Sequence, residues 1–193
     1  KKDFGILGTD MHLHANGIDQ SKIREKSKIN NPAICKSQIL MRDYQFKEAK
    51  IVMQELIEDV TCRLRERKQL ARTIHFSFGY TKGGGIHKQH TLTDATNLEQ
   101  DIFKVVNDYA NQLCDKHALY RTLSVSLTQF IHEENRQLNL FVNEYKRQRD
   151  ENLAKTIDTL QRKYGKGIVS KAISYTASGT KHNRLGLMAG HKM

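Results

Sequence analysis

Residues 33–64 show two successive patterns of apolar positions. Residues 33–42 contain two isoleucines, a leucine and a methionine, which together predict a strand. Asp43 follows and is expected to cap a helix. In that helix the apolar residues recur at steps of three and four, which defines one helical face. They are Ala49, Val52, Met53, Leu56, Val60 and Leu64.

The next block predicts a β-hairpin. In residues 70–80 alternate side chains fall on opposite sides of a strand, with Ile74, Phe76 and Phe78 on one side and Thr73, His75 and Ser77 on the other. Three glycines at 83–85 supply a turn, and residues 86–92 return as the second strand. The glycines lack the GxxxxGK[ST] spacing of a phosphate-binding loop, so the hairpin interpretation is favoured.

A second helix and a fourth strand complete the pattern. Thr96 and Glu99 have capping-box spacing and open a helix with one apolar stripe through residue 113. Residues 119–128 alternate cleanly as a strand. The order βαββαβ predicts an α+β fold, a two-layer sandwich with an antiparallel-rich four-stranded sheet and both helices on one face. The other sheet face, rich in Thr, Ser and His, must meet water or a polar partner.

The flanks divide the chain further. We expect a short helical piece at 1–18, a polar linker at 19–32, the sandwich at 33–131, a separate peptide at 132–142, and a helix with a basic tail at 143–193. The last helix is expected to begin near Asp150 and to end at Gly165. Its apolar stripe comprises Leu153, Ile157, Leu160 and Tyr164. From Ser174 the chain is small, polar and basic, and a mobile tail is expected.

Charge narrows the function. The 193 residues include 32 Lys and Arg against 21 Asp and Glu, a formal net charge of +11. This surplus favours an anionic partner, nucleic acid before membrane. The chain has no apolar run of membrane-spanning length and no signal peptide, and it starts in what reads as a helix, so we expect a piece of a longer protein. Three widely spaced cysteines favour reduced thiols in the cytoplasm over disulfides or zinc.

Catalytic chemistry is not predicted. The histidines lack metal-ligand spacing, and no nucleophile, base or paired carboxylates form a defensible set, so neither catalytic nor metal-binding residues are expected. The polar sheet face is either an ordinary solvated face or a surface that follows phosphates, and the charge favours the second. Residues 137–141, Gln-Leu-Asn-Leu-Phe, either pack on the domain or form a linear docking peptide.

These segments resemble a known family. QLNLF resembles the peptide with which bacterial polymerases bind the sliding clamp. KSQILMRDY (36–44), RLRERKQLARTIHFSFGY (63–80), HKQHTL (87–92) and LYRTLSVSL (119–127) resemble the little-finger domain of Y-family translesion DNA polymerases, with UmuC-like UV-damage repair proteins as the nearest relatives. FGILG and HANGID, within residues 1–18, are similar to the end of the thumb, and residues 150–165 are similar to the C-terminal helix of that group.

The resemblance implies a function and its residues. It implies a DNA-directed DNA polymerase in damage repair and SOS-type mutagenesis, whose Mg²⁺ ions are held by palm carboxylates absent from this chain, so that this piece alone has no cofactor and is inactive. The implied partners are primer–template DNA and the sliding clamp, while a recombinase filament is left open. The implied DNA contacts are Lys36, Ser37, Arg42, Arg72, Thr73, His75, Ser77, His87, Lys88, Arg121, Thr122 and Ser124. The implied clamp contacts are Gln137, Leu138, Leu140 and Phe141.

The alternative is a stand-alone RNA-binding module, because βαββαβ is also the order of the RRM fold. An RRM stacks bases on aromatic side chains of its open sheet face. Here the third strand, IHKQHTL, has no aromatic residue, and the phenylalanines of the second strand are assigned to the core. Binding to primer–template DNA in preference to single-stranded RNA would separate the two.

Overall fold

The computed structural model describes residues 4–19, 32–137, 143–188 and 191–192. The chain forms two units, residues 1–30 and residues 31–193. The first unit contains helix α1 (Gly5–Ala15), none of whose residues is buried within that unit. No helix in the described ranges has the length and apolar character needed to cross a membrane.

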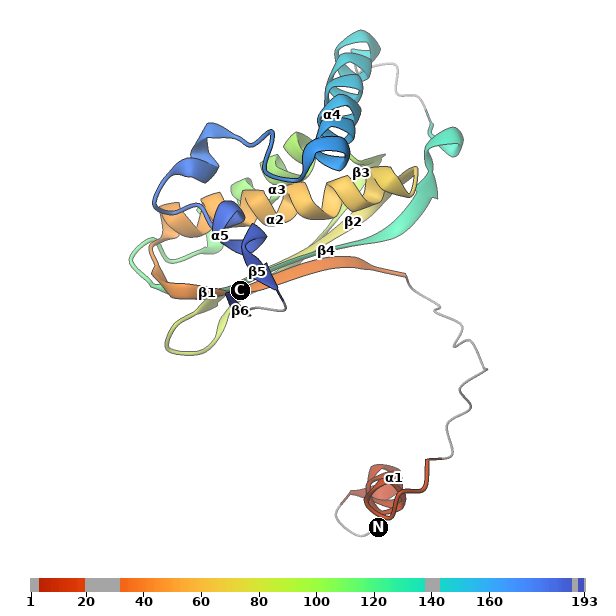
Figure 1. Cartoon of the computed structure of the whole chain (residues 1–193), viewed down its shortest axis with the longest axis vertical. Coiled ribbons are helices and arrows are strands. Elements are labelled where there is room, and N and C mark those ends of the chain that lie inside the picture. The colour runs from red at the N-terminus through yellow and green to blue at the C-terminus, as the bar shows by residue number, and fades with distance from the viewer. Residues whose placement is uncertain (1–3, 20–31, 138–142, 189–190, 193) are drawn as a thin grey trace. The chain divides into compact units, whose positions relative to one another are not determined.

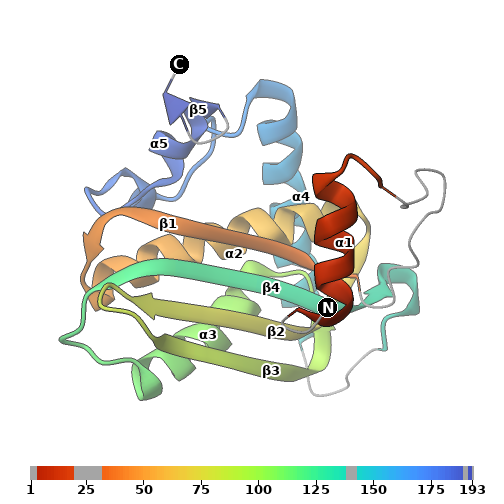
Figure 2. The same ribbon diagram turned by 90° about the horizontal axis from the view of Figure 1, so that it is seen from below.

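The second unit is built on one antiparallel sheet. Its strands are β1 (Ile34–Tyr44), β2 (Gln69–Tyr80), β3 (Gly85–Thr96) and β4 (Tyr120–His132), and they lie in the order β1-β4-β2-β3. Helices α2 (Phe46–Glu66) and α3 (Glu99–Leu113) cover one face, and the other face is uncovered by the elements of this unit (Figures 1 and 2). The predicted α+β sandwich is therefore confirmed.

The core lies between the helices and the sheet. The apolar stripe of α2 is fully buried, and Ile74, Phe76 and Phe78 of β2 face it. Tyr120 fills the end of the core, with its ring 6.0 Å from that of Phe78 and its hydroxyl donating to the Asp115 carbonyl at 2.6 Å. Burial raises the pKa of Tyr120, so the phenol stays neutral.

Two predicted helix caps are wrong. Asp43 does not cap α2, because β1 continues to Tyr44; instead the backbone N–H of Gln45 donates to the Glu48 carboxylate at 2.9 Å. The capping box of Thr96 with Glu99 is not formed either. Helix α3 begins at Glu99, and the Thr96 hydroxyl accepts from the Leu98 N–H at 3.1 Å and donates to Asp101 at 2.6 Å. In both places a strand runs longer than its apolar pattern suggested.

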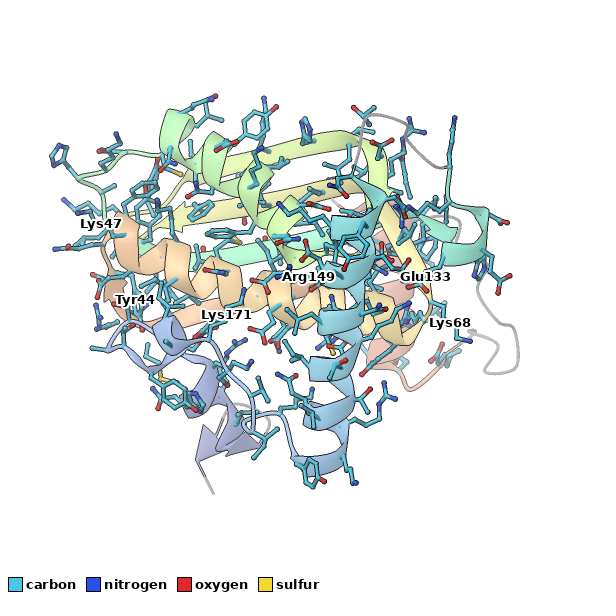
Figure 3. All side chains as sticks on the ribbon, turned by 90° about the horizontal axis from the view of Figure 1, so that it is seen from above. Tyr44, Lys47, Lys68, Glu133, Arg149 and Lys171 are labelled. Atoms are coloured by element: carbon cyan, nitrogen blue, oxygen red, sulfur yellow. The ribbon has the colours of Figure 1, made fainter. Side chains whose placement is uncertain are left out.

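Helix α4 (Glu144–Tyr164) begins before the predicted start at Asp150, because Asn143 caps it by accepting from the Lys146 N–H at 3.0 Å. It crosses the helix layer on the side away from the sheet (Figure 3). The predicted apolar stripe docks it only in part, since Ile157 is half-buried whereas Leu153 and Tyr164 are 58% and 60% exposed. Polar contacts supply further links, such as the ion pair of Arg65 with Asp158.

The expectation of a mobile tail from Ser174 is also wrong as far as Leu185. The segment forms η2 (Ala172–Tyr175) and α5 (Lys181–Leu185), and it lies beside α2 (Figure 3). Thr180 donates its N–H and hydroxyl to the buried carboxylate of Glu55, at 3.0 and 2.9 Å. Ion pairs of Lys181 with Glu58 and of Arg184 with Asp59 add to these hydrogen bonds, so contacts with α2 fix a segment that composition alone marked as solvated. A two-residue pair, β5 (Leu187–Met188) with β6 (His191–Lys192), follows.

Candidate nucleic-acid interface

The sheet face turned away from α2 and α3 is the open face (Figure 2). The pairing register and strand alternation assign small polar residues of all four strands to it. Strand alternation places them there, because their chain neighbours Leu123, Val125 and Phe76 are buried on the helix side. The pairing register aligns them in rows across the strands. One row reads Ser37, Ser124, Ser77 and His87.

Two further rows have the same character. Beside the first lies Cys35, Ser126, His75 and Gln89, and next to that lies Thr128, Thr73 and Thr91. The hydroxyls bond across strands: Ser77 and Ser124 oxygens are 2.7 Å apart, and His75 Nε2 lies 3.1 Å from the Thr128 hydroxyl. A hydroxyl has one proton and two lone pairs, so the half-buried Ser77, Ser124 and Thr128 keep capacity for an outside ligand. Thr73 does not, because it is buried and its hydroxyl already bonds to Gln129 at 2.8 Å and lies 3.2 Å from that of Thr91.

Near the hairpin end of the sheet, a glycine leaves the open face without a side chain at one position. Thr122 pairs with Gly79, and a Cβ at Gly79 would lie 2.0 Å from the Thr122 hydroxyl oxygen. A shallow depression of about 370 Å³ lies over the middle rows, lined by residues that include His75, Ser77 and Ser126. A ligand can therefore approach the backbone of the central strands closely.

Cationic side chains lie where the strands are irregular rather than in the rows. Arg42 is bound to Glu48, with Nη1 3.0 Å from Oε2, and Arg121 lies 3.5 Å from Asp43. The hydrogen bond from Arg42, with that from the Gln45 N–H, holds the pKa of Glu48 at about 2. Exposed Arg72 donates from Nε to the Leu92 carbonyl at 3.3 Å.

The twelve predicted DNA contacts thus separate into three groups. Seven lie on the open face: Ser37, Thr73, His75, Ser77, His87, Thr122 and Ser124. Three lie at the strand irregularities: Arg42, Arg72 and Arg121. Lys36 and Lys88 do not lie on the open face, because each is paired with a residue that faces the helices, Val125 and Phe76. The Lys88 ammonium lies 5.6 Å from the centre of the Tyr109 ring on α3.

Five more residues lie in the three rows and were not among the predicted contacts. They are Cys35, Gln89, Thr91, Ser126 and Thr128. The open face also carries the exposed apolar residue Ile39, which pairs with Thr122. The alternation of Ser126 and Thr128 with buried leucine and valine was the available signal. The sequence carried no such signal for Cys35 and Gln89, because only the pairing register of the strands brings them beside Ser126 and His75.

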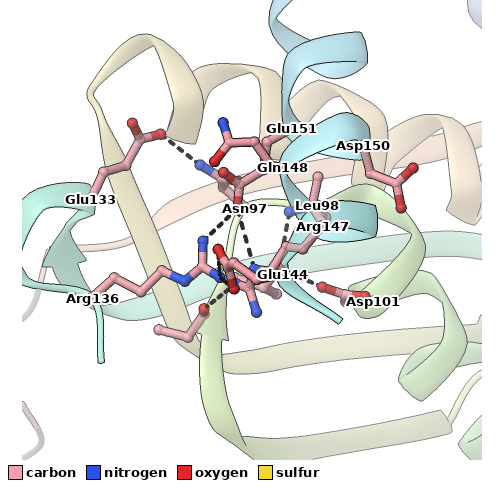
Figure 4. Close-up of polar contacts among 12 residues, drawn as sticks. Asn97, Leu98, Asp101, Glu133, Arg136, Glu144, Arg147, Gln148, Asp150 and Glu151 are labelled. Carbon is pink, nitrogen blue, oxygen red and sulfur yellow. Dashed lines mark hydrogen bonds and ion pairs between the residues drawn. The ribbon is translucent and has the colours of Figure 1, made fainter. Parts of the chain in front are cut away.

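Of the predicted clamp peptide, Gln137 is exposed, and Leu138, Leu140 and Phe141 lie outside the described residues. The residues on either side of the peptide are joined (Figure 4). Arg136 binds Glu144 at 3.0 Å and Glu151 at 2.7 Å, and Arg147 binds Glu151 at 3.2 Å. Arg136 and Glu151 are only 14% and 12% exposed, so the chain is firmly held just before and just after the peptide.

No group of three His, Cys, Asp or Glu side chains within the described ranges could hold a metal ion. The described residues thus offer no place for the Mg²⁺ ions that the resemblance assigns to the parent enzyme. Such Mg²⁺ ions would stabilise negative charge during nucleotide transfer, and carboxylates from another part of the parent enzyme would have to hold them.

The fold and the site define a class: an α+β domain whose open sheet face presents hydroxyl, imidazole and amide groups to a polar partner. Residues 32–140 match the family described as the impB/mucB/samB family C-terminal domain, and the chain belongs to this family. The family membership expected from the sequence is thereby confirmed.

Curated relatives agree with this assignment. The chain is 36% identical to the putative UV-damage repair protein UvrX of Bacillus subtilis, over 100% of this chain and 46% of the relative. It is 31% identical to DNA polymerase IV 2 of the same organism, over 99% of this chain and 47% of the relative. The chain spans about half the length of these relatives. Among solved structures, a complex of the beta-clamp processivity factor with the little finger domain of PolIV matches with a TM-score of 0.44 and 12% identity, over 57% of this chain and 100% of that one.

Proposed function

We propose that this chain is the DNA-gripping and clamp-docking C-terminal part of a translesion DNA polymerase that acts in DNA damage repair and SOS-type mutagenesis. In this proposal residues 33–131 hold primer–template DNA, residues 132–142 carry the clamp contact, and residues 1–18 and 19–32 are the end of the thumb and a linker. Nucleotide transfer, with its Mg²⁺ ions, belongs to a palm elsewhere in the parent protein. The names of the curated relatives and the shared family support it.

The open face is the observation that carries the DNA proposal. Rows of hydroxyl, imidazole and amide groups cross strands about 4.8 Å apart and can donate to successive phosphate oxygens. Such groups position a duplex without reading its sequence. The formal net charge of +11 supplies the long-range attraction. We therefore expect binding that varies little with sequence and falls steeply with salt.

A matched pair of variants tests this proposal. Ser77→Asp with Ser126→Asp adds two negative charges to the open face, whereas Thr156→Asp with Thr159→Asp adds the same two charges to the exposed side of α4. Fluorescence anisotropy with a labelled primer–template should show at least a tenfold weaker affinity for the first variant, and a much smaller loss for the second. Circular dichroism checks that both are folded. Equal losses would refute a specific role for the open face.

The clamp contact rests on residues 137–141 and on the flanking ion pairs. Leu140 and Phe141 are adjacent apolar residues suited to one pocket, with Gln137 as a hydrogen-bonding anchor and Leu138 as a smaller contact. Leu140→Ala with Phe141→Ala should cost about 2 kcal/mol or more, roughly a thirtyfold loss of clamp affinity. Asn139→Ala is the matched control, because that position is not an anchor. Calorimetry with purified clamp decides, and undiminished binding by the double variant contradicts the proposal.

The RNA-binding alternative makes a different prediction. Phe76 and Phe78 are buried on the helix side, and no aromatic ring other than histidine lies in the three rows of the open face. An RRM-like protein would prefer single-stranded RNA, stacked on such rings. Competition between primer–template DNA and single-stranded RNA of equal length separates the proposals, and a preference for RNA would favour the alternative.

A further inference from the structure

A second charged site lies on the helix side of β1, across the sheet from the rows of the open face. It is a cleft of about 260 Å³ between β1, the C-terminal half of α2, the segment after α4, and α5. Five cationic and three acidic side chains line it, together with Cys62. The proposed DNA grip on the open face does not use this cleft.

Two of the cations are neutralised within the cleft. Lys181 Nζ lies 2.5 Å from Glu58 Oε1, and Arg184 Nη1 lies 2.9 Å from Asp59 Oδ2. Lys181 is 7% exposed and Arg184 is 16% exposed. These pairs attach α5 to α2, and they leave no net charge for a ligand.

The charges of the remaining side chains that line the cleft do not cancel. Lys36 from β1, Arg63 from α2 and Lys166 from the segment after α4 face a single remaining carboxylate, Glu66. Within the described ranges none of the three cations forms an ion pair; Arg63 only donates to the Cys35 carbonyl, at 3.4 Å. The cleft therefore has an excess of two positive charges, supplied by three separate elements.

Cys62 does not reduce this excess. Burial, together with the nearby carboxylates Asp158 and Glu66, raises the pKa of its thiol to about 12. At neutral pH the sulfur is uncharged, and it lies 3.9 Å from a Glu66 oxygen. A negatively charged ligand would thus meet three unpaired cations and one carboxylate.

We propose that this cleft binds a phosphate group, with Lys36, Arg63 and Lys166 as its ligands. A guanidinium presents two parallel N–H donors that match phosphate oxygens, and the two ammonium groups add charge from either side. The volume is sufficient for one phosphate with several waters, because a water occupies about 30 Å³. The partner is either a nucleic-acid backbone or a free phosphate compound.

The position of β1 favours the nucleic-acid backbone. β1 is an edge strand, and the chain neighbours of Lys36, Cys35 and Ser37, face the opposite side of the sheet on the open face. A strand of nucleic acid that passes around this edge would contact hydroxyls on one side of β1 and the cleft on the other. The cleft would then add phosphate contacts to those of the open face.

Phosphate titration of the full chain tests the site directly. Amide signals of residues 36, 63 and 166 should shift in a saturable manner when sodium phosphate is added at constant ionic strength, and chloride should not reproduce the shifts. The variant Lys36→Gln/Arg63→Gln/Lys166→Gln should lose them. The control Lys104→Gln/Lys116→Gln/Arg149→Gln, which removes the same charge from exposed positions elsewhere, should keep them.

A DNA arm identifies the source of the phosphate. If a backbone occupies the cleft, the log–log salt dependence of primer–template binding should be shallower in the cleft variant than in the control, by about 0.9 for each phosphate that the variant no longer binds. Saturable phosphate shifts with equal salt slopes would assign the cleft to a free phosphate compound. Absence of saturable shifts, with equal slopes in the two variants, would overturn the proposal.

Discussion

The ion pair of Arg65 with Asp158 is the buried link between α2 and α4, and its removal should release α4. Two bonds of 2.6 and 2.9 Å join the groups, and their side chains are 7% and 9% exposed. Burial alone would lower the pKa of Arg65, but the hydrogen bond and charge of Asp158 raise it. Asp158→Ala leaves a buried guanidinium with one protein acceptor, the Asn97 carbonyl at 2.8 Å.

Loss of one partner from a buried pair costs about 3–5 kcal/mol. The other links of α4 are mainly polar, such as the 2.7 Å bond from Gln100 to Asp150, and its apolar side chains are largely exposed. Release of the helix lets water reach Arg65, and this is less costly than unfolding the sandwich. We therefore expect α4 to undock while the sheet stays folded.

Amide hydrogen exchange measures this outcome by segment. In Asp158→Ala the protection of residues 150–164 should fall about a hundredfold or more, while that of β2 and β4 changes little. Asp150→Asn is the control, because its bond to Gln100 is exposed and should cost under about 1 kcal/mol. Unchanged protection of α4, or an equal loss across the sheet, would refute the reasoning.

Three further changes test the fold. Glu48 has a folded-state pKa of about 2 against an ordinary value of 4.5, so its contribution to stability is present above pH 4.5 and lost as the pH falls towards 2. Urea unfolding should show Glu48→Gln about 1 kcal/mol less stable than the parent at pH 6, and the difference should vanish near pH 2. Gly79→Ala forces the Thr122 hydroxyl away and should cost about 1–3 kcal/mol, recovered in part by Thr122→Ala in the same chain. Tyr120→Phe removes the 2.6 Å bond to the Asp115 carbonyl, and thermal unfolding should report a loss of about 1–2 kcal/mol.

The sandwich itself could be predicted because each of its elements has a local signal. Strand alternation in residues 70–80 and 119–128 separated the core side from the open side, and the buried Ile74 and Leu127 confirm it. The three-and-four spacing of α2 likewise matches its buried face. Such periodicity is set by backbone geometry, so it survives without knowledge of the partners.

Element ends and long-range pairs carry no such signal. Asp43 has the chemistry of a cap, but the strand continues past it, and its carboxylate lies near Arg121, 78 residues away. The resemblance likewise implied that Lys36 contacts DNA. Alternation along β1 instead turns Lys36 to the helix side of the sheet, where its paired residue Val125 lies. The folding of the segment after Ser174 depends on Glu55 and Glu58, which lie over 120 residues earlier. No local pattern links residues at that separation.

The positions of the lysine and arginine side chains determine how the formal net charge of +11 can contribute to DNA binding. The rows of the open face contain no lysine or arginine. Several cations elsewhere are neutralised in ion pairs with carboxylates, among them Lys181 with Glu58 and Arg184 with Asp59. If the open face holds DNA, the hydroxyls and the nearby backbone make its short-range contacts, and unpaired cations around it set the dependence on salt. Removing a hydroxyl such as Ser124 should then lower affinity at all salt concentrations alike, whereas removing a cation should also change the slope.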